Sequence, residues 1–468
     1  KCGRESPAAP GLTTCACGGI LDIVYDYAAI RRHFSPKSLA DCRDYSMWRY
    51  RPLLPVEEES APPPLRVGWS PLYKADRLAQ ALGLDTPYLK DDGQNPTSSL
   101  KDRASALAVV KAREAGADTI ACSSTGNAAS SLAGNAAAAG LSTYIFVPSR
   151  APRGKVAQLR IFGATVISVE GSYEDTFELS RAAIDRWGWY NRNAAINPYL
   201  SEGKKTVALE IMEQLSWQVP DYIAISVGDG CTIAGLWKGL KDLYAIGFID
   251  RLPRLISAQA EGCCPINRAI AENKPWEPME ENTLADSIAV GVPRNADKAL
   301  TAIRESDGIV VNVSDQEIMA AQQLLGRTCG VFGEPAGVTG TAGAKKAAEL
   351  GIPDERIFAA RPGMDFEYKG IGVHAVRGGT VAGEHTSSSA MNAAERPRAS
   401  CSMISDSRAV MRYSAASSSA RAAKRSSSVT TITRFSSVDG RRRVRYSSSM
   451  ESPYTAAMVT IQYKPSAS

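Results

Sequence analysis

A regular alternation of strand and helix patterns between Val67 and about Pro353 constrains the fold of this chain more than any other feature. Short apolar runs typical of buried strands recur at Tyr88–Lys90, Thr119–Cys122, Thr143–Val147, Thr165–Val169, Tyr222–Val227, Leu255–Gln259 and Gly308–Val313. Helix patterns lie between most of them, for example at Arg153–Phe162, Tyr173–Trp187 and Ser201–Leu215. Such alternation predicts an α/β fold in which parallel sheets are covered by helices on both faces.

Length and composition exclude several classes of function. The 468 residues suffice for two or three domains, and 44% of them are hydrophobic. The net charge of +5 is uneven, because residues 384–468 carry 13 basic against five acidic side chains, which leaves the first 383 residues slightly acidic. We therefore expect no nucleic-acid surface on the main body. No apolar run reaches the roughly 18–20 residues of a membrane span, and no signal peptide is recognised.

Ten cysteines in a chain of this length are not typical of a disulfide framework, so we expect a reducing, cytoplasmic setting.

One lysine, Lys101, stands behind a turn and ahead of an alanine-rich helix, in the segment Asn-Pro-Thr-Ser-Ser-Leu-Lys-Asp-Arg at 95–103. A lysine amine can form a Schiff base with an aldehyde cofactor, which gives it covalent chemistry. Alone, a lysine followed by an acid and a base is usually a solvated helix start. Two later loops in a consistent order favour the chemical interpretation.

The first loop joins the strand pattern 119–122 to an alanine-rich helix at 128–139. Small hydroxyl residues and a glycine at such a junction present backbone N–H groups, and the start of a helix dipole, to an anion. The residues concerned are Ser123, Ser124, Thr125, Gly126 and Asn127.

The second loop follows the strand pattern 222–227 and leads into another helix. Its glycines let the backbone approach a phosphate closely, and the N–H groups at the helix start supply donors. The residues concerned are Gly228, Asp229, Gly230, Cys231 and Thr232. Because an acid would repel a phosphate dianion, we expect the side chain of Asp229 to point away.

Together the three segments resemble the fold-type II pyridoxal-phosphate enzymes, and among them most the threonine synthases. The usual lysine motif there is Pro-Thr-Gly-Ser-Phe-Lys-Asp-Arg, so Ser98 replaces a glycine and Leu100 a phenylalanine. The resemblance implies that Lys101 carries pyridoxal 5'-phosphate and acts as general base. It also implies that Asn127 bonds the cofactor ring, that loop 228–232 grips the cofactor phosphate, and that loop 123–126 holds the carboxylate of a small amino-acid substrate.

The implied reaction is the conversion of O-phospho-L-homoserine and water to L-threonine and phosphate, by a lyase that could work as a homodimer. Asp102 and Arg103 are expected to cap the helix and pair with neighbours. The family holds the leaving phosphate with a segment like Asn-Ser-x-Asn-Pro-x-Arg-x-x-Gly-x-Lys-Thr. This chain has Ala194, Ala195 and Leu200 at the three ligand positions.

Either Lys204 or Arg192 compensates for these replacements, or the leaving group is different and uncharged. Two alternatives therefore stay open beside a threonine synthase. One is a related lyase, such as a threonine or serine dehydratase or a β-replacement enzyme. The other is an inactive homologue that only binds ligands.

The resemblance also predicts a domain plan, with two doubly wound domains and the cofactor between them. Residues 66–106 plus 200–383 would form the large domain, and residues 107–199 a small mobile domain inserted in it. Residues 1–65 would form a ribbon-like segment, a helix and a linker. In the ribbon, Cys2, Cys15 and Cys17 offer three of the four ligands of a structural zinc site. The alternative is a vestigial ribbon held by packing.

The last part of the chain departs from the family. A strand near Arg356–Ala360 should lead to Ser/Thr-Gly-Asn-Gly, whose hydroxyl bonds the pyridine nitrogen, but Arg361-Pro-Gly-Met364 stands there. Residues 384–468 include 22 serines and runs of arginine, a composition that predicts disorder. We interpret this tail as sequence out of register with the protein, or as a real basic tail that binds acidic partners.

Overall fold

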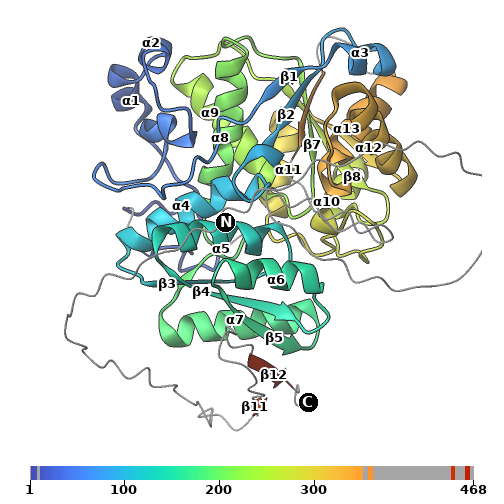
Figure 1. Ribbon diagram of the computed structural model, residues 1–468. Coiled ribbons are helices and arrows are strands. Elements are labelled where there is room, and N and C mark those ends of the chain that lie inside the picture. The colour runs from blue at the N-terminus through green and yellow to red at the C-terminus, as the bar shows by residue number, and fades with distance from the viewer. Residues whose placement is uncertain are drawn as a thin grey trace, which may run out of the picture. The chain divides into compact units, whose positions relative to one another are not determined.

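The fold was obtained as a computed structural model that describes residues 2–7, 11–194, 196–351, 357–361, 444–447 and 459–463 (Figure 1). All of them belong to one compact unit, made of Lys1–Gly372 and Ser436–Ser468. Two six-stranded sheets organise this unit.

The first sheet has the strand order β1-β2-β10-β7-β8-β9. Only β1 runs antiparallel, against β2, and all other neighbours are parallel. Its strands are β1 (Leu72–Lys74), β2 (Tyr88–Asp91), β7 (Tyr222–Ser226), β8 (Arg254–Ala260), β9 (Ile309–Val313) and β10 (Ile357–Arg361).

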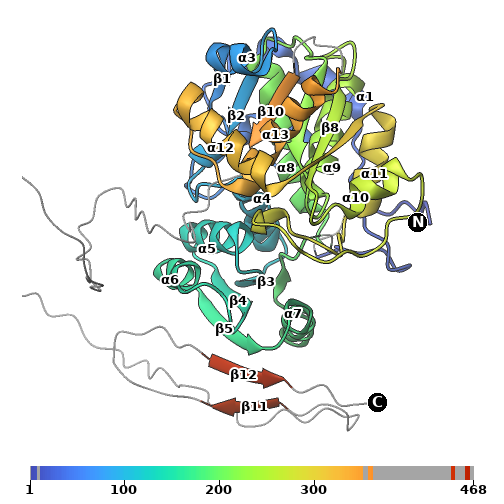
Figure 2. The ribbon, with the colours of Figure 1, turned by 90° about the vertical axis from the view of Figure 1, so that its right-hand side faces the viewer.

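The second sheet has the order β11-β12-β5-β4-β3-β6. Its strands are β3 (Thr119–Ser123), β4 (Ser142–Pro148), β5 (Thr165–Glu170), β6 (Tyr190–Asn191), β11 (Val444–Ser447) and β12 (Val459–Tyr463). Strand β12 lies parallel to β5, with β11 antiparallel at the edge (Figure 2). These two strands are all that the structure describes of the 384–468 tail. The disorder predicted for the remainder, and the origin of the tail, lie outside the described residues.

Helices cover both sheets. The first half of the chain forms α1 (Tyr27–His33), α2 (Pro36–Ala40), η1 (Met47–Leu53), α3 (Asp76–Leu82), η2 (Asp92–Gln94), α4 (Lys101–Glu114), α5 (Asn127–Ala139), α6 (Arg153–Ile161), α7 (Tyr173–Trp187) and α8 (Tyr199–Gln214). The second half forms α9 (Cys231–Ala245), α10 (Pro265–Ala271), η3 (Asp286–Ile288), α11 (Ala296–Glu305), α12 (Asp315–Cys329) and α13 (Pro335–Glu349).

The alternation of side chains along each strand explains the layers. In β7, Ile223 and Ile225 face the core that contains α8 and α9, whereas Tyr222 and Ala224 face the core that contains α13. In the second sheet, one face packs on α4, α5 and α6, and the other on α7. Because both faces of the central strands are buried, most of their residues are apolar, which is why they were visible in the sequence.

The predicted α/β class is confirmed. Each of the seven predicted strands forms with ends within one residue of the prediction, and the helix predicted at Tyr173–Trp187 has those bounds. Strands β1 and β6 were missed because they have only three and two residues. The chain leaves the first sheet after β2 and returns to it at β7, as an inserted domain would require, but the boundaries at 106/107 and 199/200 stay predictions.

The segment 26–65 is more than the predicted helix and linker. It forms α1, α2 and η1, and Phe34, Leu39, Tyr50 and Leu53 are buried in the same core as α8 and α9. Arg49 forms an ion pair of 2.6 Å with Glu213, which lies near the C-terminal end of α8. This ion pair connects the segment to a helix that covers the first sheet.

Candidate active site

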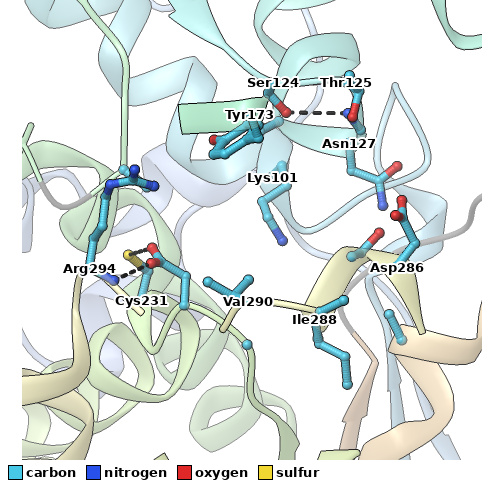
Figure 3. Close-up of a pocket in the computed structure, with 18 of the residues that line it drawn as sticks. Lys101, Ser124, Thr125, Asn127, Tyr173, Cys231, Asp286, Ile288, Val290 and Arg294 are labelled. Carbon is cyan, nitrogen blue, oxygen red and sulfur yellow. Dashed lines mark hydrogen bonds between the residues drawn. The ribbon is translucent and has the colours of Figure 1, made fainter. Parts of the chain in front are cut away.

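A cavity of about 850 Å³ lies beyond the carboxyl ends of β3 and β7, the last residues of which are Ser123 and Ser226 (Figure 3). The carboxyl end of parallel strands is where α/β proteins usually bind ligands, because the loops that follow the strands converge there. Both predicted loops and the predicted lysine line this cavity: Lys101, Ser123–Asn127, Gly228–Thr232 and Lys204. The structure therefore brings together every residue that the sequence proposed for cofactor and substrate.

Lys101 is the first residue of α4, and its side chain points into the cavity (Figure 3). The preceding turn is closed by the buried carboxylate of Asp102, which accepts hydrogen bonds from the N and Oγ1 atoms of Thr97, both at 2.7 Å. Ser98 in this turn has φ +60°. This is a left-handed conformation in which the family's glycine avoids the strain that a side chain causes.

Arg103 turns away from the cavity into the protein. It binds Asp92 through Nε and Nη2 (2.8 and 2.7 Å) and Glu210 through Nη1 and Nη2 (2.5 and 2.7 Å). Lys90 binds the same Glu210 at 2.9 Å. Asp102 and Arg103 pair with neighbouring side chains, as predicted, but neither caps the helix, because the cap position is Leu100 and it has no side-chain cap hydrogen bond. This buried ionic network fixes the start of α4 against β2 and α8.

The cavity changes the acidity of the Lys101 amine. Burial, followed by the nearby charge of Lys204, lowers its pKa from 10.5 to about 8, and Arg192 acts in the same direction, whereas Glu334 opposes the shift. Near neutral pH a much larger fraction of this amine is uncharged than of an exposed lysine. The uncharged amine is the form that attacks an aldehyde or takes a proton.

The loop at 123–127 is held from two sides. The backbone N of Ser123 donates to Oδ1 of Asn193 at 2.8 Å. Asn127 begins α5, and its Nδ2 donates to Oε1 of Glu334 at 3.0 Å. Glu334 immediately precedes α13, which covers the first sheet, whereas α5 covers the second sheet. This hydrogen bond therefore joins helices of the two sheets.

The loop at 228–232 is shaped by its glycines. A Cβ on Gly228 would lie 2.7 Å from Cα of Ile288, and one on Gly230, where φ is +87°, would lie 2.8 Å from the carbonyl oxygen of Asn295. Side chains are therefore excluded, and bare backbone N–H groups stand before the first turn of α9, which begins at Cys231.

Asp229 lines the cavity, and two hydrogen bonds hold its carboxylate. Its Oδ1 accepts the backbone N–H of Arg294 at 2.8 Å, and its Oδ2 accepts the Cys231 thiol at 3.1 Å. The carboxylate thus joins the Arg294 loop to the first residue of α9. That it points away from a bound anion stays a prediction.

Several cavity residues could not be identified as site residues from the sequence pattern. Glu334 was visible only as a Glu-Pro helix start, and the stretch Asp286–Val290 matched no motif, yet both line the cavity. Arg192 follows β6, whose two residues were too short for recognition, and was noted only as a substitute ligand. Leu200 is buried in the apolar core beside α4 and α5, while Ala194 lines the cavity and Ala195 lies outside the described residues.

Two ion pairs connect elements of the two sheets at the cavity rim. Lys155 of α6 lies 3.3 Å from Asp286, and Arg294 lies 2.7 Å from Glu174 of α7. The guanidinium of Arg294 also lies 4.0 Å from the ring centre of Phe177, a cation–π distance.

The N-terminal thiols of Cys2, Cys15 and Cys17 gather within 4.8 Å of one another. Hydrogen bonds from Cys15 and Cys2 lower the pKa of the Cys17 thiol to about 7. Structural zinc normally takes four ligands, and three are found in the described part of the chain. Zinc therefore stays a prediction. Among the described helices, none has the length and apolar character needed to cross a membrane.

The chain matches the family described as pyridoxal-phosphate dependent enzyme over residues 64–361. It is 42% identical to a threonine synthase of Methanosarcina acetivorans over 356 residues, which are 75% of this chain and 86% of that protein. It is 40% identical to a threonine synthase of Methanocaldococcus jannaschii over 370 residues, which are 78% of this chain and 90% of that protein.

Solved structures agree in fold. Maize serine racemase superposes with a TM-score of 0.57 at 22% identity, covering 64% of this chain and 89% of its own. Tomato (Solanum lycopersicum) threonine deaminase isoform 2 gives a TM-score of 0.55 at 22% identity, covering 64% and 85%.

Proposed function

Since this chain belongs to the pyridoxal-phosphate dependent enzymes and, within them, to the threonine synthases, we propose that the cavity around Lys101 is where it converts O-phospho-L-homoserine and water to L-threonine and phosphate. The observation that carries this assignment of the site is the half-buried amine of Lys101, which has a lowered pKa and points into a cavity between the loops 123–127 and 228–232.

The residues present fit the cofactor. Lys101 would bind its aldehyde, and the backbone of loop 228–232 would hold its phosphate, because the glycines at 228 and 230 leave no room for side chains and α9 starts there. Asn127, positioned by Glu334, would contact the ring. When bound, pyridoxal phosphate supplies an electron sink at the carbon next to the substrate's amino group.

The chain's own residues then have distinct tasks. The substrate carboxylate binds at 123–126, where the start of α5 favours an anion. The freed Lys101 amine takes the proton from Cα, a contribution of about 10²–10⁴-fold for a positioned base. A pKa of about 8 suits this task near neutral pH, because the amine can both accept and return a proton.

A substrate panel tests the proposal. Purified protein with added pyridoxal phosphate is given O-phospho-L-homoserine, L-threonine or L-serine, and inorganic phosphate, threonine, ammonia and keto acid are measured. We expect phosphate and threonine from phosphohomoserine in equal amounts. Ammonia and keto acid from threonine, without phosphate release, would instead identify a dehydratase.

The dehydratase is the second candidate, and one observation favours it: the arginine position of the family's phosphate-binding segment is Leu200, which is buried in the core. An inactive binding homologue would release none of these products. The predicted homodimer and cytoplasmic location remain proposals, which light scattering of the purified protein and cell fractionation would test.

A further inference from the structure

Two buried cations besides Lys101 line the cavity. The side chains of Arg192 and Lys204 come from different elements, the segment after β6 and the middle of α8, and the residues are only 3% and 4% exposed. Both charges act on Lys101, because each of them lowers the pKa of the Lys101 amine. Burying a charge is costly unless a partner compensates it, so the partners of these two cations matter.

Neither cation has an acidic partner in the described part of the chain. The guanidinium of Arg192 donates from Nε and Nη2 to Oγ of Ser105, at 3.3 and 3.2 Å, and no carboxylate of the described residues lies within 4.0 Å of it. The amine of Lys204 makes neither a hydrogen bond nor an ion pair with any described residue. Such cations are tolerated where a ligand of opposite charge binds.

Unused donors accompany the cations. Oδ1 of Asn193 accepts a hydrogen bond from the backbone N–H of Ser123, while Nδ2 of Asn193 is buried and has no partner among the described residues. The hydroxyl of Ser123 is buried and unpartnered too. Both residues line the cavity next to Arg192. Two cations and two orphaned polar groups together point to an anion that is absent from the protein itself.

This group comes from other elements than the cofactor's phosphate cradle. The cradle consists of backbone N–H groups at 228–232, after β7 of the first sheet. In the second sheet, Ser123 ends β3, and Arg192 and Asn193 follow β6, while Lys204 belongs to α8. The cavity therefore has two places for anions. The substrate proposed above has a carboxylate and a phosphate, and the α5 start at 123–126 already serves the carboxylate.

We propose that Arg192, Lys204 and Asn193 bind the phosphate group of O-phospho-L-homoserine and hold it as it leaves. This inference rests on the proposed function. When the Cγ–O bond breaks, the electron pair left at Cβ by loss of its proton forms the Cβ–Cγ double bond. The C–O electron pair stays on oxygen and inorganic phosphate departs, while the two cations balance its charge. An arginine can grip such a group with two parallel hydrogen bonds, which the buried Leu200 cannot do.

The test uses the cofactor-loaded full chain, so that the cradle at 228–232 is occupied. The variants are Arg192→Met, Arg192→Lys and Asn193→Asp, with Arg150→Met as the matched control, because Arg150 is an exposed arginine at the same cavity. Three quantities are measured: the inhibition constant of inorganic phosphate, kcat/KM for O-phospho-L-homoserine, and the dissociation constant of L-threonine from the change in cofactor absorbance.

We expect Arg192→Met to weaken phosphate inhibition about 10–100-fold and to lower kcat/KM about 10²–10³-fold, because a charge-assisted bidentate contact is lost. Threonine, which has no phosphate, should bind within about threefold of the unmodified protein. Arg192→Lys should fall between, Asn193→Asp should weaken phosphate binding by repulsion, and Arg150→Met should match the unmodified protein.

Unchanged phosphate inhibition in Arg192→Met, an equal loss of threonine and phosphate binding, or an equal effect of Arg150→Met would each overturn the inference. Melting temperature and cofactor content identify a variant that has not folded, in which case Arg192→Lys and Asn193→Asp decide. If the unmodified protein releases no phosphate from O-phospho-L-homoserine, the proposed function fails. The anion site is then judged by the dissociation constant of inorganic phosphate, measured from the change in cofactor absorbance, which needs no turnover.

Discussion

Two groups of buried charge meet at the start of α4, and they are built differently. On one side of the helix, Lys90 and Arg103 are matched by Asp92 and Glu210, and all four side chains are 0% exposed in their ion pairs. On the other side, the cavity holds the cations Lys101, Arg192 and Lys204, with Glu334 as the acid whose charge is felt at Lys101.

This difference separates charges that stabilise the fold from charges that we propose bind a ligand. In the matched network every cation is saturated by carboxylates within 3 Å, so its removal should harm stability. In the cavity, burial and the charges of Lys204 and Arg192 lower the pKa of Lys101. Two polar groups nearby, the Asn193 amide nitrogen and the Ser123 hydroxyl, have no partner among the described residues. Lys101 and Arg103 are two positions apart on α4, and their side chains point to different sides of the helix. The same helix therefore borders both the matched ionic network and the cavity.

The largest effect is expected on activity. Lys101→Ala should lower kcat for phosphate release by at least about 10²–10⁴-fold, because both the covalent anchor and the base are lost. Its melting temperature should stay close to that of the unmodified protein. Lys111→Ala, on the same helix but in a pair with Glu114, is the control. If the Lys101→Ala protein were still active, the Lys101 amine would be neither the cofactor anchor nor the base that we propose.

A large effect on stability is expected from the matched network. Glu210→Gln leaves Lys90 and Arg103 undercompensated and should lower the free energy of unfolding by about 3–5 kcal/mol. Urea unfolding measures this loss. Glu305→Gln, which removes one member of a half-exposed pair with Lys241, should cost only about 0–1 kcal/mol. Similar losses in both variants would show that the network has no special role.

The same carboxylate predicts a pH dependence. Burial alone would raise the pKa of Glu210, but the charges of Arg103 and Lys90 lower it from 4.5 to about 2. A depressed carboxyl pKa stabilises the fold above the unfolded value, and this contribution disappears as the pH falls from about 4.5 to about 2. The stability difference between the unmodified protein and Glu210→Gln should therefore shrink over this window, and a constant difference would contradict the assignment.

A moderate effect is expected on the acidity of the cavity amine. Because the charge of Lys204 lowers the pKa of Lys101, Lys204→Met should raise that pKa from about 8 toward 10.5. The pH dependence of the rate at which cofactor-free protein captures pyridoxal phosphate reports it. Lys155→Met, at the cavity rim in a pair with Asp286, is the control and should leave the profile in place.

The smallest effect concerns the turn before α4. Ser98→Gly should stabilise the protein by at most about 1 kcal/mol, since relief of the positive φ is partly offset by the greater freedom of glycine in the unfolded chain. Thermal unfolding measures the change. Ser99→Gly gives the contrast, because Ser99 Oγ accepts the backbone N–H of Lys101 and its loss should destabilise.

Much of the site was readable from local sequence. The loops at 123–127 and 228–232 each lie directly after a strand pattern and before a helix, so their place at the carboxyl ends of strands could be inferred. Lys101 could be recognised at a helix start that follows a turn. Arg192 and Glu334 could not be identified in this way. The first follows a two-residue strand, and the second acts through Asn127, which is 207 positions away in the chain.

By itself, the sequence determined the α/β alternation, the order of the three segments and the lysine for which we propose the chemistry, because these depend on patterns within about ten residues. Only the tertiary structure decided which buried cations have acidic partners. Arg103 finds Glu210 at a separation of 107 residues, whereas Arg192 and Lys204 find no acid among the described residues. Charge balance depends on distance in space, and a linear pattern contains no information about that distance.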